Sequence, residues 1–171
     1  AAHRDALRRR HALHFQEYLS VWDKKIFTRE SLDALQRLEL ARANIEAAMA
    51  WALESPDRAK QYIELAAYSV NLLRVRGPAR SRVPTLRRAL ELCGPQASED
   101  RVRILVALGM AERESGDNAA ANAATEESLR MAEQLNLPRM TAMAWFQLAT
   151  ISFAEGRLPE AQQRHETALK M

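Results

Sequence analysis

Histidine and cysteine are the residues of this 171-residue chain whose chemistry depends most directly on spacing. His11 and His14 are three positions apart, so on a helix their rings would share a face and could bind a metal ion. The spacing is not His-x-x-x-His and no cysteine lies nearby, which favours packed or solvated histidines. We expect His165 to pack at the edge of the core. Cys93 is the only cysteine, which excludes an intrachain disulfide and a thiolate cluster, and we expect an inert thiol beside Gly94.

Carboxylates also occur in close pairs, but their setting does not favour catalysis. Glu112 with Glu114, and Glu126 with Glu127, lie among alanines in helical patterns. A catalytic pair needs two environments that separate the two pKa values, and we expect solvated helix faces instead. Neither G-x-x-x-x-G-K-[ST] nor G-x-G-x-x-G occurs. The sequence therefore predicts no enzyme, no cofactor and no metal site.

Arginine is the strongest charge feature of the chain. Residues 1–93 carry 17 Lys/Arg and 11 Asp/Glu, and no acidic residue occurs between Glu64 and Glu91. A basic cluster can bind phosphate, nucleic acid or acidic side chains, or can be a solvated surface, and all these alternatives stay open. Interleaved aromatic residues for base stacking are lacking, which weighs against nucleic acid. The predicted basic patch consists of Arg74, Arg76, Arg80, Arg82, Arg87 and Arg88.

Composition indicates the fold class and the setting. Residues that favour helices, chiefly Ala, Leu, Arg and Glu, are abundant, only 6% of residues are aromatic, and no stretch alternates β-branched with polar residues. We predict an all-α fold of about eight helices. No apolar run is long enough to span a membrane, and we expect a cytoplasmic protein. The chain starts without methionine and ends inside a helical pattern, so we expect a fragment of a longer protein.

A pattern that recurs after 40 residues must position these side chains. Leu108-Gly109, Gly116, Ala121 and Leu129 are followed by Leu148-Ala149, Gly156, Ala161 and Leu169. Such fixed-period similarity is typical of stacked repeats. A small residue allows close helix approach and the glycine supplies the turn, so each copy predicts a helical hairpin. Gly77 and Leu90 suggest a weaker, earlier copy.

The predicted organisation follows from these copies and from the helix-stopping residues. Ser55-Pro56 and Ser98 are helix starts, whereas Gly77-Pro78, Gly94-Pro95 and Asn136-Leu137-Pro138 are breaks. Pro84 must lie in the first turn of its helix or break it. We predict a two-helix segment, 1–55, followed by three hairpins within 56–171, namely 56–95, 98–137 and 138–171.

Stacked hairpins would form a right-handed solenoid whose first helices line a concave groove. Apolar side chains exposed there could bind a peptide or a helix, although the phenylalanines could instead belong to the core. The predicted groove residues are Asn71, Arg74, Met110, Arg113, Met143, Phe146, Thr150 and Phe153.

The small-Gly-Ala-Ala spacing of Ala149, Gly156, Ala161 and Ala168, preceded by Trp145 and Leu148, resembles a tetratricopeptide repeat. The 40-residue step is similar to the variant with longer helices in bacterial signalling proteins. This resemblance is good for residues 142–171, fair for 102–135 and poor for 63–92.

The first half carries a second resemblance. Leu38-Glu39, Asn44-Ile45, Ala47-Ala48 and the stretch from Trp51 to Glu54 resemble the segment where repeats begin in STAND-class regulators, including LuxR-type transcriptional regulators. The resemblance implies a non-enzymatic arm of a bacterial regulator that binds proteins or senses a ligand in signal transduction. It also implies contact with adjacent domains of a longer chain. The alternative is a helical module that binds nucleic acid or anions through residues 74–88.

Overall fold

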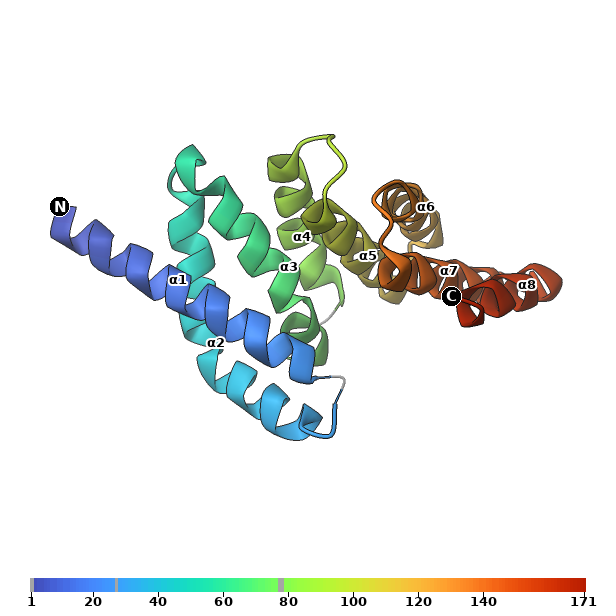
Figure 1. The fold of residues 1–171 in the computed structure, drawn as a ribbon, viewed down its shortest axis with the longest axis horizontal. Helices are drawn as coiled ribbons and strands as arrows, with labels where there is room; N and C mark the ends of the chain where they lie inside the picture. Colours follow the sequence, from blue (N-terminus) through green and yellow to red (C-terminus); the bar gives the residue numbers. More distant parts are fainter. Residues whose placement is uncertain (1, 27, 77–78) are drawn as a thin grey trace. The chain divides into compact units, whose positions relative to one another are not determined.

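The computed structural model describes residues 2–26, 28–76 and 79–171, except for the side chains of residues 2, 71 and 73–76. These ranges contain eight α-helices, one 3-10 helix and no strand, which confirms the predicted all-α class (Figure 1). The helices are α1 (Ala2–Lys25), α2 (Ser31–Leu53), η1 (Pro56–Arg58), α3 (Ala59–Arg76), α4 (Ala79–Cys93), α5 (Glu99–Glu114), α6 (Asn118–Gln134), α7 (Pro138–Ala154) and α8 (Leu158–Leu169). None of the described helices is both long and apolar enough to cross a membrane.

The chain divides into two compact units, Ala1–Gly77 and Pro78–Met171. In the first unit, α1, α2 and α3 pack against one another. In the second unit, each helix from α4 to α8 packs against the next one along the chain, and α5 also contacts α7. The boundary falls inside the predicted hairpin 56–95, so that hairpin stays a prediction.

The ends of the helices follow the local chemistry of the sequence. The side chain of Ser98 accepts a hydrogen bond from the Arg101 backbone N–H, as a helix N-cap does. Ser55 also precedes a helix, but its side chain makes no capping hydrogen bond. Gly116 and Gly156 have φ values of 90° and 76°, a left-handed conformation that only glycine adopts without strain. The two turns of the 40-residue pattern therefore form as predicted.

Pro84 lies inside α4, neither in its first turn nor at its end. The prediction that Pro84 must lie in the first turn or break the helix is wrong, because α4 begins at Ala79, five residues before the proline, and continues through it to Cys93. A proline inside a helix removes one backbone hydrogen bond. Helix α4 packs against α5, and its Leu86 and Ala89 are buried, so we expect the burial of apolar surface to offset this loss.

Helices α5, α6 and α7 meet at Gly109. A methyl group added to Gly109 would lie 2.4 Å from Thr125 Oγ1 on α6 and 3.2 Å from Gln147 Oε1 on α7. The Gln147 side chain donates a hydrogen bond from Nε2 to the Val106 carbonyl, at 3.2 Å, and Thr125 Oγ1 lies 3.3 Å from Gln147 Oε1. The small residue of the repeat thus allows close helix approach, as its position predicts.

Polar side chains fasten α1 to α2 and η1 in the first unit. The Trp51 indole donates to Asp5 at 3.0 Å, and the same carboxylate accepts from Arg58 at 2.6 Å. The Arg58 guanidinium lies over the Trp51 ring, 4.1 Å from its centre, and Arg8 pairs with Glu54. Because Asp5 and Arg8 are both in α1, these contacts fix the start of α1 on the end of α2.

Candidate functional site

The α7 face is the exposed side of α7 that carries Phe146, Thr150 and Phe153. These positions are spaced four and three residues apart, so they share one side of the helix. Phe146 is 57% exposed and Phe153 is 65% exposed. The Thr150 hydroxyl donates to the Phe146 carbonyl at 2.9 Å, so the polar atom of this side chain is already paired within the helix. Both phenylalanines therefore face solvent and are not core residues.

The other predicted groove residues differ in their surroundings. Met110 and Met143 are partly buried, because both pack against the cluster formed by Val102, Val106 and Ala132. Only part of each methionine side chain is therefore open to a partner. Arg113 is partly exposed and lies 3.9 Å from Glu114. The side chains of Asn71 and Arg74 lie outside the described residues, so the structure shows only the predicted groove residues of α5 and α7.

Most of the described arginines of the predicted basic patch pair with carboxylates. Arg87 Nη2 lies 2.6 Å from the buried Glu112, and Arg88 Nη1 lies 2.9 Å from Glu91. Arg82 is buried and pairs with Glu114, so the prediction that it belongs to a surface patch is wrong. Arg80 is exposed, and the Arg74 and Arg76 side chains lie outside the described part of the chain. These pairs neutralise much of the charge that a phosphate group would need.

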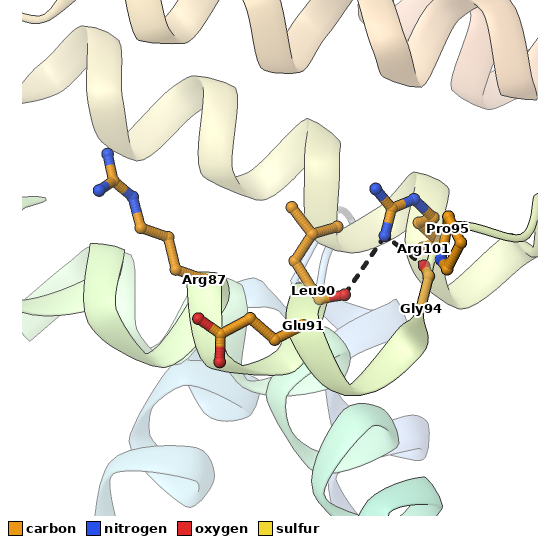
Figure 2. A pocket seen from close by; sticks show the side chains of 6 residues that line it. All are labelled: Arg87, Leu90, Glu91, Gly94, Pro95 and Arg101. Atoms are coloured by element: carbon orange, nitrogen blue, oxygen red, sulfur yellow. Dashed lines mark hydrogen bonds between the residues drawn. The ribbon is translucent and has the colours of Figure 1, made fainter.

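A hollow of about 440 Å³ lies where α4 ends and α5 begins (Figure 2). Arg101 Nη1 donates to the Leu90 carbonyl at 3.2 Å and to the Gly94 carbonyl, while Nη2 pairs with Glu127 on α6 at 2.6 Å. These carbonyls belong to the end of α4, where helices leave acceptors without partners. The Arg101 side chain thus joins α4, α5 and α6, and its role in this hollow is structural.

The histidines and the cysteine are placed as follows. His11 Nε2 lies 3.2 Å from Asn44 Oδ1, and His14 packs edge-on against the Phe15 ring. Among the described residues, no group of three or more histidine, cysteine or acidic side chains is placed to hold a metal ion. Burial raises the pKa of the Cys93 thiol, and Asp100 raises it further while Arg101 opposes the shift. A raised pKa disfavours the reactive thiolate.

Two features were not recognised in the sequence. Leu169 in α8 is 85% exposed, although the matching residue of the first copy, Leu129, is only 9% exposed. A hollow of about 400 Å³ lies between α1 and α2, lined by Leu7, Arg8, His11, Ala47 and Trp51. The exposure of Leu169 follows from comparing the two copies, because Leu129 is covered by α7. The hollow depends on the crossing geometry of α1 and α2, which residue spacing does not encode.

Comparison with known proteins adds a fold likeness. No family model and no curated protein matches the chain. The crystal structure of BtubC (BKLC) from P. vanneervenii superposes with a TM-score of 0.62 over 95% of this chain and 72% of that one. The two sequences are 16% identical, so the likeness concerns the fold alone.

Proposed function

We propose that this chain is a non-enzymatic protein-interaction module, and that the α7 face binds an apolar segment of a partner. The observation that carries the proposal is the pair of exposed rings, Phe146 and Phe153, held on one side of α7. Two aromatic side chains seven residues apart have the i, i+7 spacing of the anchors with which an amphipathic helix contacts an apolar surface of its partner. The partly buried Met110 and Met143 contact a common core cluster in α5–α7, and their flexible thioethers suit an adaptable surface.

The 40-residue step gives the proposed architecture. In this proposal α5–α8 are two tetratricopeptide-like hairpins of a right-handed solenoid that serves as an arm of a bacterial STAND-class or LuxR-type regulator. The turns at Gly116 and Gly156 and the close approach at Gly109 support the hairpins. Partner binding would shift the regulator only by the difference in affinity between its two states.

The experiment places a photoreactive benzoylphenylalanine at position 153 of the chain in its host cell. We expect one discrete cross-linked partner, which is then purified for affinity measurement. Phe146→Ala with Phe153→Ala should weaken binding at least about tenfold, since a buried aromatic anchor contributes more than the 1.4 kcal/mol that a factor of ten requires.

Leu40 provides the matched control because it is 85% exposed but lies on α2. The photoreactive residue at position 40 should not capture the same partner, and Leu40→Ala should leave the affinity unchanged. An affinity that survives the double phenylalanine substitution would rule out the α7 face as the binding surface.

A further inference from the structure

The two copies of the 40-residue pattern carry similar residues at positions that differ sharply in exposure. Val106 is 4% exposed, whereas Phe146, 40 residues later, is 57% exposed. Leu129 and its counterpart Leu169 differ in the same way, at 9% and 85%. Met131 packs against a core cluster, but Met171 is exposed. At these three positions the second copy therefore presents to solvent apolar side chains whose counterparts in the first copy are buried or partly buried.

Helix α7 is what covers the first copy. Its Met140 and Met143 pack against the cluster that contains Val106, and Met131 of α6 packs against the same cluster. Its Ala144 and Leu148 form a cluster with Leu129. The surface of α5 and α6 thus binds the α7 pattern Met-Ala-x-x-x-Leu, which is formed by Met143, Ala144 and Leu148.

The second copy keeps several apolar residues of this surface, including the counterparts of Leu129 and Met131. Alanine recurs at 121 and 161, leucine at 129 and 169, and methionine at 131 and 171, and both alanines are buried. His165 replaces Thr125, and its ring lies edge-on to Phe146 with centroids 5.1 Å apart. The contact joins Phe146 of α7 to His165 of α8, four residues before the exposed Leu169. We call Phe146, His165, Leu169 and Met171 the end face.

We propose that the end face docks an amphipathic helix with the apolar pattern of α7, namely alanine and leucine four residues apart preceded by methionine. The argument is continuity: the α6–α7 interface already joins this surface to such a helix, 40 residues earlier in the chain. The inference deepens the proposed function, because Phe146 belongs to both surfaces. Phe153 belongs to the α7 face alone, which separates the two in experiment.

The test supplies such a helix by appending a second copy of residues 132–155 after Met171, which keeps the 40-residue step. The chain carries Cys93→Ser and Leu169→Cys, and the rate of maleimide labelling at position 169 is measured with and without the appended segment. We expect the appended helix to slow labelling at least about tenfold, because docking buries the thiol as α7 buries Leu129.

Two controls make the result specific. Ala144→Glu and Leu148→Glu in the appended copy only should restore fast labelling, and a cysteine in place of the equally exposed Leu40 should label at one rate in both chains. Phe153→Glu should leave the slow labelling at position 169 unchanged, because Phe153 belongs to the α7 face alone. The proposal for the α7 face and the proposal for the end face can therefore fail independently.

Equal labelling rates at position 169 with and without the appended helix would overturn the proposal. Sedimentation of the unextended chain tests the other occupant. A dimer that Leu169→Glu dissociates would assign the end face to a second copy of the chain and would likewise overturn the proposal of an α7-like helix.

Discussion

Gly109 is the residue at which packing leaves the least room. Gly109→Ala would place a methyl group 2.4 Å from Thr125 Oγ1, a buried hydroxyl that also donates to the Ala121 carbonyl at 2.7 Å. Overpacking costs about 1–3 kcal/mol, and the better helix propensity of alanine offsets about 1 kcal/mol of it, so we expect a net loss of up to about 2 kcal/mol. Urea denaturation measures the free energy of unfolding.

The double variant Gly109→Ala with Thr125→Ala is the control for this prediction. Removing the hydroxyl relieves the clash, so the two substitutions should be non-additive, with the pair less destabilising than the sum of its members. A Gly109→Ala chain as stable as the original would contradict the close approach.

Sequence reasoning found the role of Gly109 because the 40-residue step marks it as a small position, matched by the buried Ala149. The partners of the arginines could not be found in the same way. Arg82 and Arg87 meet carboxylates 32 and 25 residues away, and such pairs depend on how α4 and α5 are rotated. The sequence suggested a basic surface where the structure has ion pairs.

At the scale of helices, two ion pairs connect α4 to α5. The buried Arg82 pairs with the partly buried Glu114, and its Nε and Nη1 make no hydrogen bond within the described structure. Glu114→Ala would leave a buried guanidinium without its carboxylate partner, and we expect a loss of about 2–3 kcal/mol, measured by chemical denaturation. Arg82→Met combined with Glu114→Ala should recover most of that loss, because the methionine needs no partner.

Arg88 and Glu91 provide the exposed comparison. Their pair lies within α4 on the surface, so Glu91→Ala should change stability by less than about 0.5 kcal/mol. If Glu114→Ala were equally mild, the Arg82 pair would not hold α4 on α5.

The helices themselves were predicted well, since caps, glycine turns and prolines act locally. Ser98 caps α5 as predicted, and Asp117 caps α6 by accepting a hydrogen bond from the Ala120 backbone N–H. The prediction for Pro84 failed, since α4 continues through the proline. Local rules treat a proline as a break, and they do not include the packing of α4 against α5. Tertiary contacts decide such cases.

At the scale of the whole molecule, the division at residues 77 and 78 was not predicted. The sequence indicates a turn at Gly77-Pro78 within a hairpin, whereas the structure groups α3 with α1 and α2. A stop signal shows where a helix ends but does not show which neighbours the helix packs against. The exposure of Phe146 and Phe153 was likewise open in the sequence, because a helical stripe has the same spacing whether it faces a core or a partner.

Separate expression of residues 1–76 and 79–171 tests the two units. Each has its own buried core, with Leu19, Leu38 and Ile45 in the first and Ile104, Leu105 and Ile151 in the second. Domains of this size can fold alone, so we expect both fragments to be helical by circular dichroism and to unfold cooperatively.

Ile45→Ala should lower the stability of the first fragment by about 2–4 kcal/mol. In the full chain it should leave the unfolding of the second unit unchanged. A fragment 79–171 without cooperative unfolding, or a single transition of the full chain that Ile45→Ala shifts as a whole, would show that the two units fold as one.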